Sequence, residues 1–220
     1  MSQRDANLSI DEYFHLYNRG NSKQLIFKSG SDYRRFMSLL FISNGSYAFK
    51  LRDYRDSPDL YQIERGDPLV AIGAYCLMPN HFHILVKPLV EGGISVFMKK
   101  LATGYSMYFN RVYERTGTLF EGRYKSKHVD SDEYLKYLYA YIHLNPLKLI
   151  DPEWRSKGLA DIQGGREYLM QYSFSSYPDF VGKPRRERVL ISNEHFPQYF
   201  KDVADIESEM GTWMKYQELN

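Results

Sequence analysis

The chain has 220 residues, of which 43% are hydrophobic and 25% charged, so it is long enough to bury a sizeable core and has an ordinary globular composition. A net charge of +2 does not by itself indicate a nucleic-acid-binding protein, and the single cysteine, Cys76, excludes an internal disulfide and a cysteine-based zinc site. Because we find no apolar leader and no run of membrane-spanning length, we expect a cytoplasmic protein with no membrane partner.

The first half of the chain predicts strands mixed with one helix. The β-forming runs lie at residues 13–17, 47–54, 69–77 and 81–87. Apolar residues at helical spacing predict a helix over 31–43, capped by Ser31 or Asp32. The tripeptide Met78-Pro79-Asn80 suits a tight connection, so the runs on either side of it are interpreted as an antiparallel hairpin.

The second half predicts longer helices. Apolar residues recur at helical spacing over 94–114, and 118–129 is polar, basic and partly β-forming. A further helix over 134–144 is expected to begin at the cap Asp130, with Glu133 at the capping-box position, and to end before Pro146. Beyond Ile150 we expect short helices and loops, with one more helix after Glu194. Because strands and helices do not alternate regularly, we expect an α+β sandwich with helices on one face of a mainly antiparallel sheet.

Two histidines stand two residues apart inside the run 81–87. Side chains alternate across a strand, so His81 and His83 project from one face while Phe82, Ile84 and Val86 project from the other. The apolar residues would anchor the strand in a core. The two imidazoles would then share one metal ion at the sheet surface, or else be two half-exposed histidines on an ordinary strand.

The predicted helix over 134–144 leads to a second pair of polar residues. Tyr141 and Asn145 are four positions apart and so share a helical face. If that face lies over the histidines, the site holds two imidazole nitrogens, an amide oxygen and a phenol. Mixed nitrogen and oxygen ligands with open positions suit Mg²⁺ or Mn²⁺ acting on a phosphate, and Tyr141 would attack the phosphorus. The alternative is that Tyr141 only packs against its neighbours.

Basic residues are concentrated in two parts of the chain. Between residues 97 and 127 they outnumber acidic ones, and the cations that we expect to bind DNA there are Lys99, Lys100, Arg111, Arg123, Lys125 and Lys127. The second cluster consists of Lys183, Arg185, Arg186 and Arg188. Basic side chains interleaved with aromatic ones are typical of a surface that follows a phosphate backbone. A solvated helix face and a basic loop are the other interpretation.

Five segments occur in an order that resembles a known family. They are His15 with Arg19-Gly20, the run Met-Pro-Asn-His-Phe-His at 78–83, Phe-Glu-Gly-Arg-Tyr-Lys at 120–125, Tyr-Ile-His-Leu-Asn-Pro at 141–146, and Tyr-Ser-Phe-Ser-Ser-Tyr at 172–177. Together, across residues 13–182, they resemble the REP-associated tyrosine transposases, which are single-tyrosine, IS200-like members of the HUH nuclease superfamily. One residue departs from the pattern, because Phe174 stands where the family usually has tryptophan.

The resemblance implies a ferredoxin-like, RRM-like fold with the histidine pair on a central strand and the nucleophile on a following helix. It implies that His81, His83 and Asn145 bind the metal and that Tyr141 is the nucleophile. Such proteins cut single-stranded DNA beside palindromic hairpins, leaving a 5′-phosphotyrosine and a free 3′-OH. Arg19 is expected to bind DNA as well. Residues 1–150 would form the catalytic domain and residues 151–220 an extension packed on it, in a monomer or a homodimer.

Two other functions remain open from the sequence. A ferredoxin-like sheet with exposed aromatic residues would also suit a non-catalytic protein that binds single-stranded nucleic acid. A metal-dependent phosphodiesterase would use water in place of the tyrosine. His15 and His143 are left out of the metal ligands, the latter because it lies two helical positions from Tyr141 and so points away from it.

Overall fold

The computed structural model describes residues 9–49, 59–199 and 202–215. Four strands form one sheet in the order β2-β3-β1-β4, with bounds β1 Tyr13–Arg19, β2 Val70–Met78, β3 His81–Pro88 and β4 Lys125–Val129. Every neighbouring pair is antiparallel. The expected hairpin is therefore confirmed, because β2 and β3 pair directly across the turn at Pro79 and Asn80. β3, which carries the histidine pair, is a central strand.

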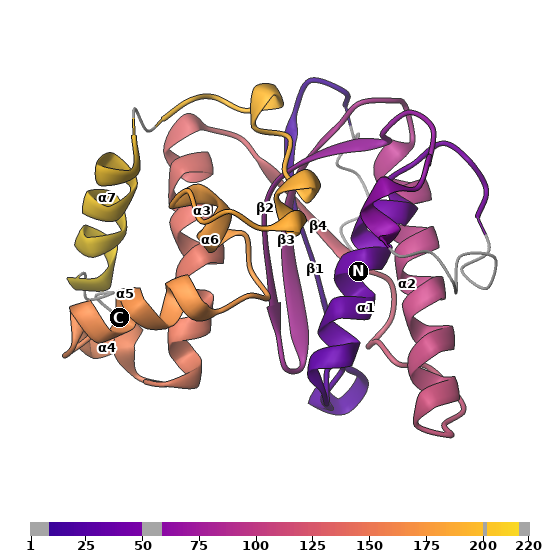
Figure 1. Ribbon diagram of the computed structural model, residues 1–220, viewed down its shortest axis with the longest axis horizontal. Helices are drawn as coiled ribbons and strands as arrows, with labels where there is room; N and C mark the ends of the chain where they lie inside the picture. The colour runs from indigo at the N-terminus through magenta and orange to yellow at the C-terminus, as the bar shows by residue number, and fades with distance from the viewer. Residues whose placement is uncertain (1–8, 50–58, 200–201, 216–220) are drawn as a thin grey trace.

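One face of the sheet packs on two long helices, α1 (Gly30–Ser43) and α2 (Gly93–Val112), as Figure 1 shows. The alternation of β3 turns Phe82, Ile84 and Val86 into this core, as expected. The predicted apolar positions of both helices are buried there as well, apart from Tyr108, which is half-buried.

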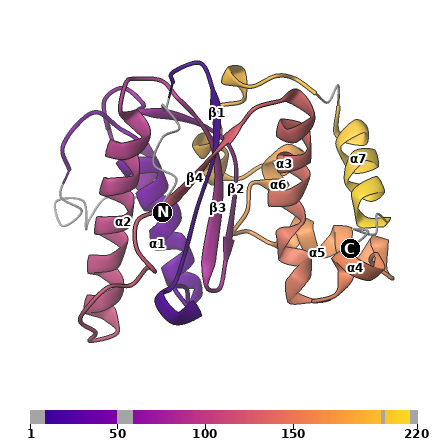
Figure 2. The ribbon, with the colours of Figure 1, turned by 180° about the vertical axis from the view of Figure 1, so that it is seen from behind.

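The opposite face of the sheet packs on α3 (Asp132–Leu144), which Figure 2 shows on the far side of the sheet from α1 and α2. Leu135, Leu138 and Ile142 of this helix lie in one cluster with Ala74 and Leu85 of the sheet. The α+β class is confirmed, but the expectation that helices cover only one face is corrected. All nine residues of β2 are buried, so both of its faces are apolar and both need a covering layer.

Beyond residue 150 the chain packs on the outer side of α3. This extension contains α4 (Trp154–Lys157), α5 (Ile162–Gln171), α6 (Tyr177–Phe180) and α7 (Val203–Lys215). Ala140 and Leu144 of α3 are buried with Trp154, Leu169 and Met210 in a third apolar cluster. The expected final helix is thus confirmed. In the residues that the structure describes, no helix is both long and apolar enough to span a bilayer.

The extension also covers the outer edge of β2. Leu77 N donates to Phe174 O at 2.9 Å, and Ser176 N donates to Tyr75 O at 2.9 Å. Further along the edge, Ser192 N donates to Ile72 O at 3.0 Å. Residues 172–192 therefore complete the hydrogen bonding of a strand that would otherwise end the sheet. The functional division of the chain at residue 150 stays a prediction.

Both helix caps differ from those expected. Ser29 caps α1, and Asp32 lies at the third helical position, where its carboxylate accepts from the backbone N–H of Ser29 at 2.9 Å. Ser131 caps α3 and accepts from Tyr134 N at 3.1 Å, where Asp130 was expected. In each case the sequence offers adjacent cap residues, and tertiary packing selects between them.

The expected strand over 47–54 is not formed in its first part, because residues 47–49 are irregular, and residues 50–54 lie outside the described residues. The weak β signal at 118–129 yields a strand only from Lys125 onward.

Candidate functional site

The histidine pair lies on the sheet face that packs on α3. The antiparallel register places Arg19 of β1 opposite His81 and Tyr17 opposite His83, so these side chains share that face. His81 Nδ1 lies 2.7 Å from Asn80 Oδ1, and His83 Nδ1 lies 2.9 Å from His15 Nε2. Each ring is therefore held through its Nδ1 atom. This leaves Nε2 of each ring as the atom for an additional partner.

His15 lies next to the histidine pair and contacts His83. Asn80 Oδ1 can only accept, so His81 Nδ1 donates to it, and the tautomer of His83 with its proton on Nδ1 would donate to His15 Nε2. In this arrangement the Nε2 atoms of His81 and His83 carry lone pairs. Metal-ligating histidines commonly donate their other ring N–H in this way, which fixes the tautomer and the ring orientation.

α3 brings the tyrosine and the asparagine to the same place. The Tyr141 ring lies edge-on to the His83 ring at a centroid distance of 5.3 Å, and 5.9 Å from the His15 ring. Asn145, at the end of the helix, is buried, and its Oδ1 atom makes no hydrogen bond to the residues that the structure describes. The spacing of four positions puts both side chains at the histidine face. Their roles as nucleophile and ligand stay predictions.

Burial keeps the three site histidines neutral. It lowers the pKa of His15 to about 4, assisted by the charge of Lys127. It also lowers the pKa of His81 to about 4, although the neighbouring Asn145 side chain opposes the shift. The pKa of His83 lies well below its usual value because of burial and because His15 and His81 would repel a second charge. Neutral imidazoles are the form that binds metals.

The donor set suits a divalent ion with open coordination positions better than a structural zinc, which needs four protein ligands. Residues 9–49, 59–199 and 202–215 contain no cluster of three or more His, Cys, Asp or Glu suited to an ion. Any ion at this face would therefore be held by His81, His83 and the amide oxygen of Asn145. That oxygen is buried and lies next to the His81 side chain without a well-aligned hydrogen bond, so an ion held by His81 and His83 could also bind it. Two imidazoles and one amide oxygen leave open positions for phosphate oxygens.

Some of the predicted DNA-binding cations gather around this face. Lys127 lies opposite His15 and Lys125 opposite Tyr17 on β4, and both are exposed. Arg19 is about half exposed and forms a 2.5 Å ion pair with Glu121. Arg123 is exposed in the loop that leads into β4.

The cations of α2 lie on the other side of the sheet. Lys99 and Arg111 are exposed on that helix. Lys100 is engaged in the fold, because its Nζ atom donates to Gly45 O at 2.5 Å and to Tyr47 O at 2.9 Å. These residues are therefore not brought together with the histidines.

Two cations at the site were missed by the sequence analysis. The guanidinium of Arg155, in α4, lies 4.3 Å from the centroid of the Tyr141 ring. The charges of Arg155 and Lys148 both contribute to the low pKa of His83. Arg155 is fourteen positions from Tyr141 and has no periodic relation to it. The one feature of the sequence that could have indicated a cation here was the basic segment Trp154-Arg155 with Lys157.

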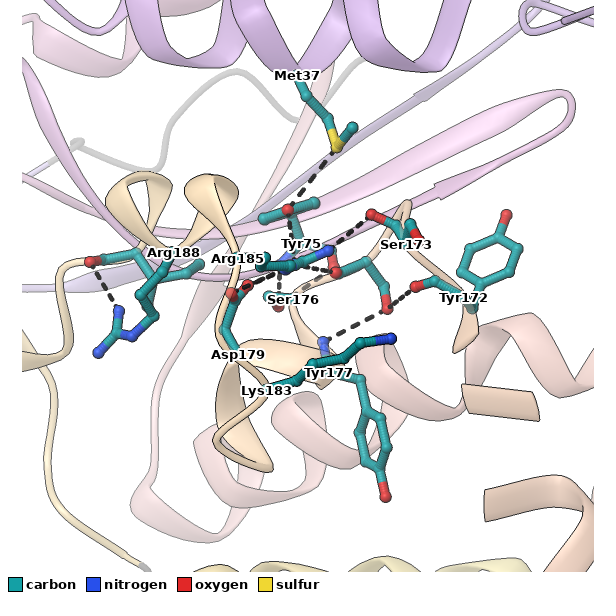
Figure 3. A network of polar contacts seen from close by, with 12 residues as sticks. Met37, Tyr75, Tyr172, Ser173, Ser176, Tyr177, Asp179, Lys183, Arg185 and Arg188 are labelled. Atoms are coloured by element: carbon teal, nitrogen blue, oxygen red, sulfur yellow. Dashed lines mark hydrogen bonds and ion pairs between the residues drawn. The ribbon is translucent and has the colours of Figure 1, made fainter. Parts of the chain in front are cut away.

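The second basic cluster is largely engaged within the fold. Arg185 is surrounded by partners, as Figure 3 shows: Nε donates to Asp179 Oδ1 at 2.8 Å, Nη1 donates to Ser173 O at 2.8 Å, and Nη2 donates to Tyr75 Oη at 3.1 Å. The side chain is only 11% exposed. Arg185 therefore locks the segment after residue 172 onto β2, and we correct its assignment as a DNA-binding residue.

Its neighbours have looser contacts. Lys183 Nζ donates to Met170 O at 3.2 Å, and Arg188 Nη1 donates to Ile191 O at 3.2 Å. Arg186 is 55% exposed and pairs with Asp59 at 2.8 Å. These three side chains reach solvent, and their role in binding DNA stays a prediction.

Two further residues have structural positions. His143 is fully buried away from the site, with Nε2 at 2.8 Å from Ser176 Oγ, and burial lowers its pKa to about 3. Phe174 stacks on Tyr33 of α1 at a centroid distance of 4.0 Å. The departure from tryptophan at this position is thus accommodated by a stacked pair that joins the extension to α1.

Comparisons with known proteins agree with this arrangement. Residues 66–145 match the family Transposase IS200 like, and that segment contains the histidine pair, Tyr141 and Asn145. This part of the chain is therefore similar to the IS200-like transposases.

A solved structure extends the likeness in fold. It is described as the structure of a REP-associated tyrosine transposase bound to a REP hairpin, with a TM-score of 0.51 and 14% identity, covering 92% of this chain and 93% of that chain. The fold that the resemblance to the REP-associated tyrosine transposases implies is thereby confirmed. No curated protein matches the chain.

Arg185 and Arg186 provide a test of the structural assignment. Arg185→Met should lower the free energy of unfolding by about 3 kcal/mol or more, because it leaves the buried Asp179 carboxylate without its partner. Arg186→Met should change it by about 1 kcal/mol or less, since its ion pair is exposed. Urea unfolding of both variants measures the difference. Equal losses would contradict the structural role of Arg185.

Proposed function

We propose that this protein is a metal-dependent single-stranded DNA endonuclease and strand transferase that binds palindromic hairpins and cleaves through a 5′-phosphotyrosine intermediate. The observation that supports it is the position of α3, which holds Tyr141 and Asn145 against the His81 and His83 face of β3. The match of residues 66–145 to a transposase family supports this chemistry.

In this proposal His81, His83 and Asn145 hold Mg²⁺ or Mn²⁺. When bound, the ion would polarise the phosphoryl oxygens of the scissile phosphate. The chain's own contribution is to fix the ligands, with Asn80 and His15 holding the two rings through their Nδ1 atoms.

Tyr141 performs the bond exchange in this proposal. Its phenol oxygen forms a bond to phosphorus as the bond from phosphorus to the 3′ oxygen breaks, and the phenol proton is released. The departing oxygen takes up a proton and becomes a free 3′-OH, while the 5′ end stays attached to the protein. Because the phosphotyrosine retains the energy of the phosphodiester, a 3′-OH can reverse the step and join a new strand.

Cations around the site position the strand. Lys125 and Lys127 on β4, Arg19 on β1 and Arg155 on α4 approach the histidine face from different sides. Phosphate contacts of this kind fix register and orientation without reading sequence. The hairpin partner is proposed by analogy with the fold relative, which was solved with a REP hairpin.

The alternative of a non-catalytic RRM-like binder is less well supported by the geometry. An RRM-like sheet stacks bases on exposed aromatic side chains of its free face. Here α1 and α2 cover one face and α3 covers much of the other. His83 is only 6% exposed, which leaves little of the central strand for stacking.

Tyr141→Phe should abolish the covalent protein–DNA adduct and strand cleavage while leaving hairpin affinity within about twofold, because only the attacking hydroxyl is lost. The adduct is measured on a denaturing gel with a hairpin oligonucleotide copied from a palindrome beside the gene. Tyr168→Phe on α5, outside the site, is the matched control and should cleave normally. Adduct formation by Tyr141→Phe would move the nucleophile to another residue. Free cleaved fragments without an adduct would favour the water-dependent phosphodiesterase.

His81→Ala and His83→Ala should each remove Mn²⁺-dependent cleavage and weaken Mn²⁺ binding by roughly 10- to 100-fold or more, since each deletes a ligand. Calorimetric titration with Mn²⁺ measures binding separately from activity. His128→Ala is the control, because His128 lies on β4 opposite Phe14, on the other sheet face. Unchanged Mn²⁺ binding in both site variants would exclude the ligand assignment.

The salt dependence of hairpin binding should identify which cations contact phosphate. Replacing Arg19, Lys125 and Lys127 with glutamine should reduce the slope of log affinity against log salt by about 2 to 3 in total, at roughly 0.7 to 0.9 per contact. Replacing Lys99 and Arg111 on α2 should leave the slope unchanged. The opposite result would assign the phosphate path to the α2 side of the molecule.

A further inference from the structure

A pocket of about 240 Å³ opens directly beside Tyr141, between α3 and the C-terminal extension. Tyr137 and Tyr141 of α3 form one wall, and Trp154 and Arg155 of α4 with Trp213 of α7 form the others. None of its lining residues is acidic. The pocket is therefore continuous with the candidate nucleophile but is not part of the metal-ligand set.

The walls are aromatic and meet at close distances. The Tyr137 ring lies 5.3 Å from the Trp213 ring at an interplanar angle of 65°, and 6.0 Å from the Tyr141 ring. The Arg155 guanidinium lies 4.3 Å from the Tyr141 ring and 5.4 Å from the Trp154 ring. Aromatic rings and arginine planes are the groups on which proteins stack unpaired bases.

One of the residues that line the pocket carries an enclosed donor that lacks a partner among the described residues. Trp154 is only 4% exposed, and its Nε1 atom makes no hydrogen bond to any of the described residues. An indole N–H is a donor only and usually finds an acceptor when it is buried. An acceptor atom on a bound molecule would satisfy it.

We propose that this pocket binds one unpaired nucleobase of the DNA strand, next to the phosphate that Tyr141 attacks. The inference rests on the proposed function, because it takes the path of the strand from the position of Tyr141. Tyr137 and Trp213 provide the stacking surface, Trp154 Nε1 donates to a ring nitrogen or carbonyl of the base, and Arg155 lies between the base and its phosphate. A paired base of the hairpin stem has its edge occupied, so the pocket selects the single-stranded flank.

The proposal assigns a function to the C-terminal extension. Trp154, Arg155 and Trp213 all lie beyond residue 150, whereas the tyrosine, histidines and asparagine precede it. In this view the extension supplies the recognition of the flanking nucleotide, and the sheet with α3 supplies the chemistry. Choice of the cleavage position would then depend on residues outside the segment that matches the transposase family.

Intrinsic fluorescence reports directly on this pocket, because Trp154 and Trp213 are the two tryptophans of the chain. The Tyr141→Phe protein is titrated with a hairpin oligonucleotide that carries unpaired flanks. Binding should quench the fluorescence, and an abasic site at one flanking position should weaken affinity by roughly 5- to 100-fold and remove the quenching. Abasic sites at the other flanking positions should have smaller effects.

Substitutions in the pocket test whether its residues cause the loss of affinity at the abasic position. Trp213→Ala should bind the intact oligonucleotide more weakly and should no longer distinguish it from the critical abasic one, and Trp213→Phe should restore part of the difference. Trp154→Phe keeps a ring but removes the donor, so it should reduce the preference for one base at that position. Tyr47→Ala, at an exposed tyrosine beside α1, is the control and should behave as the parent protein. Circular dichroism checks that α7 is retained, and Trp154→Phe serves as the test if it is not.

The outcomes separate this inference from the proposed function. Unchanged fluorescence on binding, or an abasic effect that persists undiminished in Trp213→Ala and Trp154→Phe, would overturn the pocket assignment. The wild-type protein is assayed on the same oligonucleotide for a covalent adduct. An adduct without quenching would support the proposed cleavage and contradict base binding in the pocket. Quenching without an adduct would support base binding in the pocket and contradict cleavage.

Discussion

The structure depends on one packing constraint, the burial of β2 and β3 on both faces. Each face needs an apolar layer, and α3 is the layer on the histidine side. The close approach is possible at Gly73, where an added Cβ would lie 2.9 Å from the Tyr139 hydroxyl of α3 and 2.7 Å from Phe196. The position of Tyr141 over the histidines therefore follows from core packing, and its precision comes from residues that take no part in the chemistry.

The same burial sets the electrostatics of the site. It keeps His15, His81 and His83 uncharged at neutral pH even though cations surround them. The cations remain at the rim, on β4, at the end of β1 and in the extension. A phosphate entering from solvent would thus meet positive charge first and neutral ligand atoms inside. If the proposed function is right, this ordering would first attract the polyanion from a distance and then hold it near the metal.

Features with a short sequence period were predictable. The alternation of His81 and His83 with Phe82 and the four-residue spacing of Tyr141 and Asn145 are local geometry, so their shared faces could be derived without tertiary information. The ferredoxin-like arrangement and the candidate metal ligands were predicted from motifs that occur in a family-like order. The uninterrupted apolar run of β2 also indicates that helices cover both faces of the sheet, but the prediction placed them on one face only.

Long-range features could not be derived in this way. Arg155 and Trp213 reach Tyr141 only because the extension folds back over α3, and no periodicity links them to it. Arg185 was assigned to DNA from its basic neighbours, whereas its partner Asp179 and the carbonyls of 173 and 175 engage it. A basic cluster in a sequence does not distinguish a guanidinium that faces solvent from one that joins two segments.

The covered edge of β2 has a consequence for how copies of this protein can associate. A sheet grows by strand addition only at a free edge, and here the outward groups of Ile72, Tyr75 and Leu77 are already bonded to the chain's own extension. The other edge is β4, whose exposed Lys125 and Lys127 would face like charges on an incoming copy. Neither end of the sheet offers a template for a second molecule. The protein is thereby protected from intermolecular β-pairing, and a shortened chain that lost the extension would lose that protection as well.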